Sequence, residues 1–146
     1  MPTAGKLAGA ILFGLLGWYV AGVSAPLFPD NTAPDFLIPA GASIGVLLGW
    51  RMCGARAGEG YSTAFGLGLT FAVVHLTALA FVVAFARVIK NGMRGWYKGP
   101  MDALLDIFGQ MAKVGLYFID VPLLTSLAIC AVICAFATEY FGRRYP

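Results

Sequence analysis

The feature that most constrains the fold is a set of apolar stretches, each long enough to cross a lipid bilayer. A transmembrane helix needs about 17–25 largely apolar residues to span a hydrocarbon core of about 30 Å. Four stretches have this length and carry at most one charged residue each: 7–25, 36–52, 64–86 and 121–141. We therefore predict an all-α integral membrane protein with four transmembrane helices in a single membrane domain, 1–146.

Composition supports this class and disfavours others. Charged residues make up 12% of the chain, whereas a soluble domain carries about 25%. The ten Lys and Arg only slightly outnumber the seven Asp and Glu, and most charges lie where apolar stretches end. This distribution favours contact with membrane lipids over nucleic acid. The three cysteines include no CxxC pair, so neither a disulfide framework nor a metal site or cofactor is predicted.

The first stretch has a second interpretation. Val23-Ser24-Ala25 is typical of a signal-peptidase site, which would make the stretch a cleaved leader. However, the apolar run is longer than a signal core of about 7–15 residues, and Pro26 disfavours cleavage. We expect a retained helix.

A fifth helix is predicted over 101–119, between the third and fourth spans. Its polar side chains recur every three or four residues and form one narrow stripe: Asp102, Asp106, Gln110 and Lys113. Such an amphipathic helix is expected to lie in the headgroup plane or to pack along the bundle, because its charges disfavour a free-standing span. Asp120 follows it and is placed to cap the last helix.

Gly41, Gly45 and Gly49 recur every four residues and therefore share one face of the second predicted span. Small residues at this spacing let two helices approach backbone to backbone in lipid. We interpret the stripe as a helix-packing face. A pore lining or the contact face of a homo-oligomer is the alternative.

Cationic and aromatic residues follow the second and third spans, as is typical of the membrane–water boundary. Arg51 and Arg56 belong to a glycine-rich stretch that lacks the Gly-Lys-Ser/Thr ending of a phosphate loop. This stretch is interpreted as a tight turn or a contact with lipid phosphate. A second group is interpreted as a lipid anchor: Arg87, Lys90, Arg94, Trp96 and Lys98.

His75 is the sharpest candidate for a functional side chain. It is the single histidine and lies near the middle of the third predicted span. An ionisable residue at that depth is costly, and it points to proton relay or ligand binding. The alternative is a neutral imidazole that is hydrogen-bonded to a neighbouring helix.

Cys130 and Cys134 are four residues apart and share one face of the last span. Two thiolates at this spacing can bind a soft metal or be oxidised. Apolar surroundings lower thiol reactivity, so a purely structural role is the stronger interpretation.

The first loop, 26–34, contains Asp30 and no Lys or Arg, which places it outside the cell and both termini in the cytoplasm. The third loop is rich in Lys and Arg and argues for the opposite orientation. Because early short loops usually dominate, we expect cytoplasmic termini.

Several segments resemble the TrgA family of small bacterial membrane proteins. They are Met1-Pro2-Thr3-Ala4 with Lys6-Leu7, Gly49-Trp50-Arg51, Arg56-Ala57-Gly58-x-Gly60-Tyr61, Tyr97-x-Gly99-Pro100-Met101 and Glu139-Tyr140-Phe141-Gly142-Arg143-Arg144. The resemblance implies a non-enzymatic inner-membrane protein associated with tellurite resistance, and it brings no catalytic residues. The alternatives are a small oligomeric transporter or channel, a thiol- or metal-linked membrane redox protein, and a structural subunit that recruits an unidentified protein partner.

Overall fold

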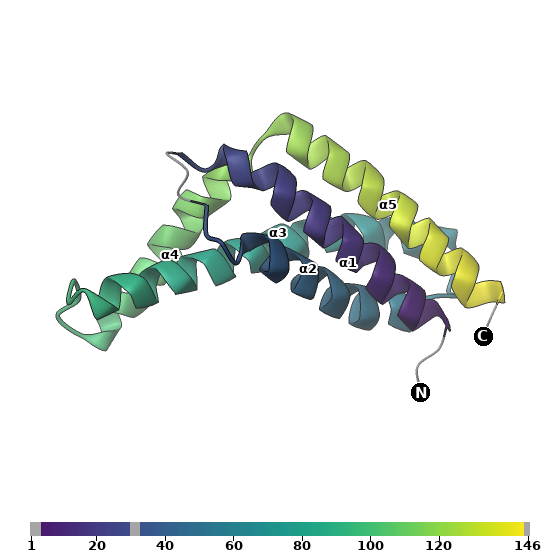
Figure 1. Ribbon diagram of the computed structural model, residues 1–146. Helices are drawn as coiled ribbons and strands as arrows, with labels where there is room; N and C mark the ends of the chain where they lie inside the picture. Colours follow the sequence, from purple (N-terminus) through teal and green to yellow (C-terminus); the bar gives the residue numbers. More distant parts are fainter. Residues whose placement is uncertain (1–3, 30–32, 145–146) are drawn as a thin grey trace.

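The computed structural model describes residues 4–29 and 33–144, and the regular structure in this part of the chain is helical. Helix α1 (Ala4–Ser24) continues into the 3-10 turn η1 (Ala25–Leu27). Helix α2 (Leu37–Leu48) passes into the π-helical turn η3 (Gly49–Cys53) and the 3-10 turn η4 (Gly54–Arg56). The order is completed by three helices (Figure 1): α3 (Tyr61–Met93), α4 (Pro100–Tyr117) and α5 (Val121–Arg144).

Four of these helical segments match the sequence prediction of membrane-spanning helices. Within the described residues, four segments are long and apolar enough to cross a membrane, judged by length and composition: Ala4–Leu27, Leu37–Arg56, Tyr61–Met93 and Val121–Arg144. The predicted all-α class with four helices of spanning length is therefore confirmed.

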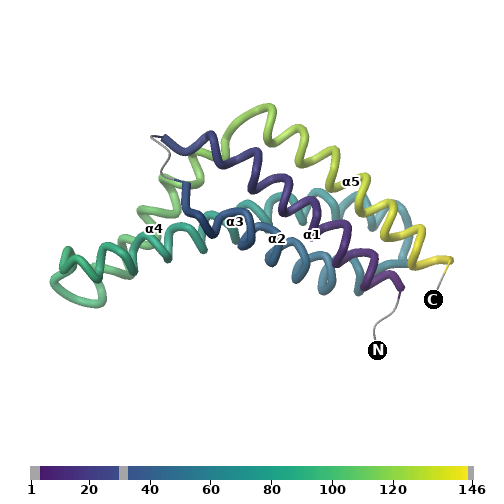
Figure 2. The backbone as a smooth tube through the Cα atoms, in the orientation of Figure 1, coloured from purple at the N-terminus to yellow at the C-terminus, as the bar shows by residue number. Residues whose placement is uncertain are grey.

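The four long segments form a bundle with extensive contacts between neighbouring helices. α1 packs against α2 and α5, and α3 packs against α2 and α5. α1 and α5 lie side by side along the bundle (Figure 2). Across its centre, the rings of Phe13 on α1 and Phe71 on α3 have their centroids 4.3 Å apart. The core is closed by fully buried aliphatic side chains: Val20, Leu79, Val83, Leu123 and Leu127.

α3 is longer than the predicted stretch 64–86 and ends at Met93. Its end has the hydrogen bonds of a Schellman motif, with the N–H of Trp96 donating to the Asn91 carbonyl and that of Gly95 to the Gly92 carbonyl. Arg87 is the first charged residue of α3. It does not end the helix, because the backbone hydrogen bonds of a helix continue equally well outside lipid.

α4 lies outside the four-helix bundle and packs against α3. The second half of α3 and α4 form a hairpin that projects beyond the other helices (Figure 1). α4 begins at Pro100, a favourable first residue because its missing N–H has no partner within a helix. α5 follows after a short turn, and the N–H of Leu123 donates to Oδ2 of Asp120 at 3.3 Å. The predicted cap at Asp120 is therefore confirmed.

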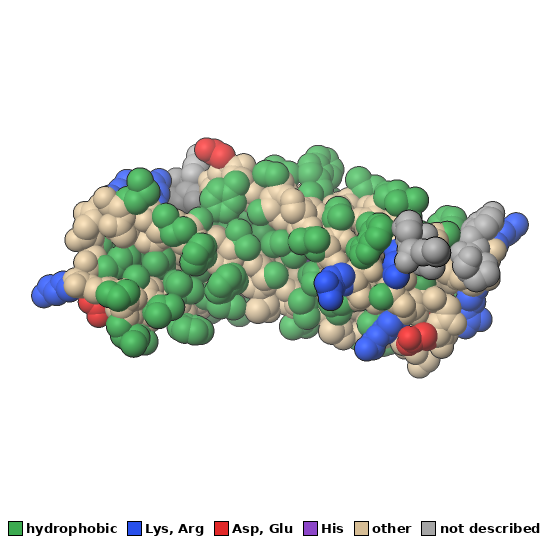
Figure 3. Space-filling model, turned by 90° about the horizontal axis from the view of Figure 1, so that it is seen from below, with side chains coloured by type: hydrophobic (Ala, Val, Ile, Leu, Met, Phe, Trp, Pro, Cys, Tyr) green, Lys and Arg blue, Asp and Glu red, His purple; other side chains and the backbone are tan. Residues whose placement is uncertain are grey.

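The surface has the character expected of lipid-facing helices. Hydrophobic side chains cover much of the left and middle of the face in Figure 3, and Lys and Arg side chains lie at its left end and over its right half. The exposed apolar side chains include large ones on every long helix: Leu15, Leu47, Val73, Phe108 and Ile129. A soluble monomer rarely exposes so continuous an apolar surface.

Candidate functional site

The glycine stripe of α2 lies against α1, and the contact is between backbones. A Cβ atom added at Gly41 would lie 2.7 Å from the carbonyl oxygen of Gly17. One at Gly45 would overlap the carbonyl oxygen of Phe13, and one at Gly49 would overlap that of Gly9. The matching stripe on α1 therefore repeats every four residues at 9, 13 and 17, and the two backbones touch along three successive turns.

His75 is buried where this seam meets α3. Its exposed fraction is 0%, and a Cβ added at Gly17 would lie 2.9 Å from its Cε1 atom. Its ring stacks on that of Phe71, with centroids 5.2 Å apart. Among the described residues, neither ring nitrogen has a hydrogen-bond partner. The alternative interpretation of His75 included a hydrogen bond to a neighbouring helix. Among the described residues, this hydrogen bond is not formed.

The three cysteines are free thiols on two neighbouring segments. On α5, Cys134 points towards α1, with its Sγ atom 4.0 Å from the Leu12 carbonyl oxygen. Cys53 of η3 is buried in the hydrophobic core, against which Cys134 also packs. Its burial removes the exposure that a reactive thiolate needs. In the described residues, no group of three or more His, Cys, Asp and Glu side chains is placed to hold a metal ion.

A group of polar contacts surrounds Glu139 near the end of α5. The side chain of Glu139 is 2% exposed. Its Oε2 accepts the N–H of Gly58 at 2.6 Å, and its Oε1 accepts the N–H of Gly60 at 2.8 Å. Nε of Arg143 donates to the same Oε1 at 2.7 Å. Gly58 and Gly60 have φ angles of 105° and 126°, a conformation that other residues rarely adopt. We call these four residues the Glu139 clamp.

The clamp fastens the α2–α3 connection to the end of α5, and other segments close around it. A Cβ added at Gly142 would lie 2.5 Å from the Cβ of Ala57, and one at Gly5 would lie 2.7 Å from the same atom. The guanidinium of Arg143 lies over the ring of Tyr61, 4.9 Å from its centroid. The start of α1, the η4 turn, the start of α3 and the end of α5 thus meet at one end of the bundle.

The predicted interface residues occupy the two ends of the molecule. Arg51 and Arg56 are exposed at the same end as the clamp. Lys90, Arg94, Trp96 and Lys98 are exposed on the α3–α4 hairpin. Arg87 is half-buried, and its guanidinium lies 5.6 Å from the centroid of the Phe28 ring. The cations of the predicted lipid anchor are therefore divided between the bundle and the hairpin.

A hydrogen bond across the hairpin loop joins the hydroxyl of Tyr97 to Oδ2 of Asp106 on α4. Nε2 of Gln110 donates to the same oxygen at 3.4 Å. The bond to Asp106 raises the pKa of Tyr97 above its ordinary value, because ionisation would remove the donated proton beside a carboxylate. Part of the polar stripe of α4 therefore faces the hairpin loop.

We expect ionisation of Tyr97 to weaken the hairpin at high pH. Its pKa in the folded protein lies above the unfolded value, so the stabilisation is complete below the ordinary tyrosine pKa of about 10 and is lost as pH rises through the folded value. Absorbance titration at 295 nm, compared with Tyr97→Phe, should isolate one late-titrating tyrosine. Asp106→Asn should return that titration to lower pH, and an unchanged curve would contradict the assignment.

Sequence reasoning did not find the Glu139 clamp or the Tyr97–Asp106 bond. One signal was present: Glu139 is the single acid in an apolar span and precedes Arg143 by one helical turn. Comparisons with known proteins add no assignment, because no family model, curated protein or solved structure matches this chain.

Proposed function

We propose that this chain is a multi-pass protein of the bacterial inner membrane that contributes to tellurite resistance without catalysing a reaction. The observation that carries the proposal is the meeting of segments in the Glu139 clamp. Arg56–Tyr61 and Glu139–Arg144 both resemble the TrgA family, and they are in direct contact around Glu139. Two of the resembling segments thus form one three-dimensional arrangement at one end of the bundle.

The bonding of the clamp supports a scaffolding role. Both carboxylate oxygens of Glu139 accept hydrogen bonds from the protein itself, and the side chain is buried. A buried carboxylate whose two oxygens both accept hydrogen bonds from the protein stabilises a loop, and it leaves little acceptor capacity for a ligand. We infer that the protein acts through its shape, its lipid contacts and its partners, including a possible homo-oligomer.

The placement of α4 belongs to the same proposal. Its outward side carries large exposed apolar residues, among them Leu104, Leu105 and Phe108, while Asp106 and Gln110 are bonded on the side of the hairpin loop. An amphipathic helix of this kind is stable in the headgroup region, with its apolar side towards the acyl chains. We propose that α4 lies there and that both termini are cytoplasmic.

A second candidate function is that of a small transporter or channel, and His75 favours it. A buried imidazole without a hydrogen bond costs free energy, and such groups are often retained for function. In this candidate, His75 would bind or relay a proton as the helices move. The free thiols of Cys130 and Cys134, one helical turn apart on α5, favour a thiol-based redox role as a third candidate.

Tellurite tolerance of a deletion strain tests the proposal and separates the candidates. We expect deletion to lower the tolerated tellurite concentration several-fold. Wild type, His75→Leu and the double variant Cys130→Ser/Cys134→Ser should each restore it, because a scaffold needs neither side chain. Glu139→Gln, which disrupts the clamp, should restore tolerance less well than wild type. Its control is Glu59→Gln, because the Glu59 side chain is exposed.

Each variant is compared at equal membrane abundance, measured by immunoblot. Unchanged tolerance in the deletion strain would refute the role in tellurite resistance. Failure of His75→Leu alone would establish the transporter candidate, and failure of the cysteine variant alone would establish the redox candidate.

A further inference from the structure

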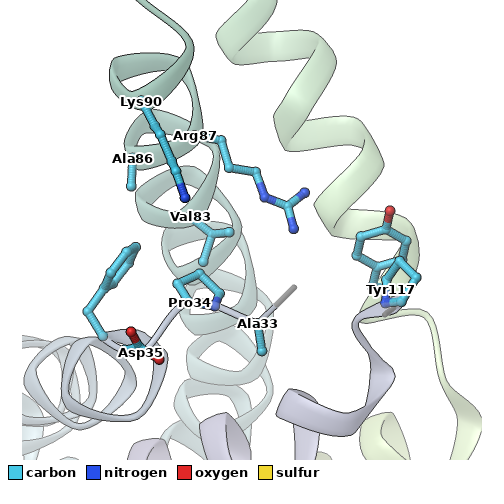
Figure 4. Close-up of a pocket in the computed structure, with 10 residues that line it drawn as sticks. Ala33, Pro34, Asp35, Val83, Ala86, Arg87, Lys90 and Tyr117 are labelled. Atoms are coloured by element: carbon cyan, nitrogen blue, oxygen red, sulfur yellow. The ribbon is translucent and has the colours of Figure 1, made fainter. Parts of the chain in front are cut away.

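A cavity of about 760 Å³ lies at the end of the bundle opposite the clamp. Its walls come from three parts of the chain: residues 29 and 33–36 before α2, the second half of α3, and the end of α4. Figure 4 shows Arg87 and Lys90 extending from α3 into it, with Pro34 and Asp35 on one side and Tyr117 on the other. These parts, distant in sequence, therefore border an open pocket that contains two cations.

Within the described residues, no ion pair neutralises either cation. In residues 4–29 and 33–144, the ion pair is Arg143–Glu139 at the other end of the molecule. Arg87 lies over the Phe28 ring, and no ion pair joins Lys90 or Arg87 to Asp35 within the described residues. Two cations at a spacing of three residues on one helix repel each other unless an anion lies between them.

The depth of the cavity matches that of lipid headgroups. The part of α3 from Tyr61 to Ala86 carries no Asp, Glu, Lys or Arg, and it spans about 39 Å at 1.5 Å per residue. This length crosses a hydrocarbon core of about 30 Å with some tilt, so Arg87 reaches the boundary. Val83 and Ala86 line the cavity on the apolar side of Arg87.

We propose that this cavity binds the phosphodiester of a membrane phospholipid, with Arg87 and Lys90 on its oxygens and the acyl chains against the apolar helix surface. The charge of the walls supports a diester. Among the described lining residues, Arg87, Lys90 and Asp35 sum to one positive charge, which complements a singly charged phosphodiester better than a doubly charged phosphate monoester. The exposed ring of Phe36 borders the cavity and offers an apolar surface to the lipid.

The site is independent of any role in tellurite resistance, so the failure of either proposal leaves the other standing. It also differs from a general cationic anchor. A diffuse electrostatic attraction would depend on the total number of cations on the hairpin, which are Arg87, Lys90, Arg94, Lys98 and Lys113. A binding cavity depends on the two that enter it. Arg94 and Lys98 do not line the cavity, and they provide a matched pair of the same charges.

Native mass spectrometry of the full chain in detergent tests the site, with phosphatidylglycerol of defined acyl chains as the probe. We expect Arg87→Gln/Lys90→Gln to weaken binding at least about tenfold, because two charge-assisted contacts are lost. Arg94→Gln/Lys98→Gln should stay within about twofold of wild type. Circular dichroism checks that both variants keep their helices.

Two further probes complete the test. Diacylglycerol with the same chains lacks the phosphodiester and should not bind, and soluble glycerol 3-phosphate should not displace the lipid. Equal loss in the two charge-matched variants would overturn the site in favour of diffuse attraction. Binding of diacylglycerol would overturn the role of the phosphate, and displacement by glycerol 3-phosphate would identify an aqueous anion as the ligand.

Discussion

Gly45→Leu is expected to prevent the helices from assembling into a stable bundle. A Cβ at position 45 already overlaps the carbonyl oxygen of Phe13, and this neighbour is backbone that cannot rotate away. A leucine must therefore separate α1 from α2, which opens the contacts along the whole stripe. Overpacking typically costs about 1–3 kcal/mol, and we expect the upper end or more because the clash is with backbone.

The measurement is unfolding of the purified protein in mixed detergent micelles, followed by tryptophan fluorescence and circular dichroism. Gly22→Leu is the matched control: it lies on α1, and a Cβ there meets nothing within 4 Å. Gly22→Leu should unfold close to wild type, while Gly45→Leu should unfold at much lower denaturant or be recovered as aggregate. Equal stability of the two variants would show that α1 and α2 do not approach through the glycines.

Glu139→Gln is expected to release the α2–α3 connection from α5. The amide keeps one acceptor oxygen, but its NH₂ group must then face a donor: the N–H of Gly58, the N–H of Gly60 or the guanidinium of Arg143. Leaving buried donors unpaired costs about 1–3 kcal/mol, and breaking a buried ion pair costs about 3–5 kcal/mol. Because Arg143 is half exposed, we expect about 2–3 kcal/mol.

Limited trypsin digestion reports this loop directly, because Arg56 lies next to it. Cleavage after Arg56 should become markedly faster in Glu139→Gln, whereas Glu59→Gln in the same loop should leave the rate unchanged. Arg143→Gln should have a smaller effect, about 1 kcal/mol or less, since the carboxylate keeps its two backbone donors. If Glu139→Gln and Glu59→Gln are digested at the same rate, the clamp does not hold the loop.

The glycine seam shows how far a one-dimensional pattern reaches. The spacing of Gly41, Gly45 and Gly49 is visible in the sequence and predicts that something packs closely against α2. The helix that packs against this stripe is harder to predict, because the α1 side of the seam includes Phe13, which is not a small residue. The atom that meets Gly45 is the backbone carbonyl of Phe13, whose side chain faces Phe71 on another helix. A backbone contact of this kind leaves no mark on the residue type.

The sites of polar contact depend even more on the folded chain. Glu139 and Gly58 are 81 positions apart, and they meet because the start of α1, the turns after α2 and the end of α5 lie together at one end of the bundle. Arg87 and Lys90 looked identical in kind to Arg94 and Lys98. Arg87 and Lys90 line a cavity only because the end of α4 and the first loop lie next to them in the folded chain.

The sequence by itself therefore determined the class of the protein, its four helices of spanning length, the amphipathic pattern of α4 and the cap at Asp120. These features depend on local composition and spacing, which act within one helical turn or across one bilayer thickness. The tertiary structure alone decided which backbone fills the glycine stripe, which donors surround Glu139, and which cations face a cavity. Those outcomes depend on how helices distant in sequence pack together. Such packing is decided by the fit of atoms from different helices, which the spacing of residues along one helix does not specify.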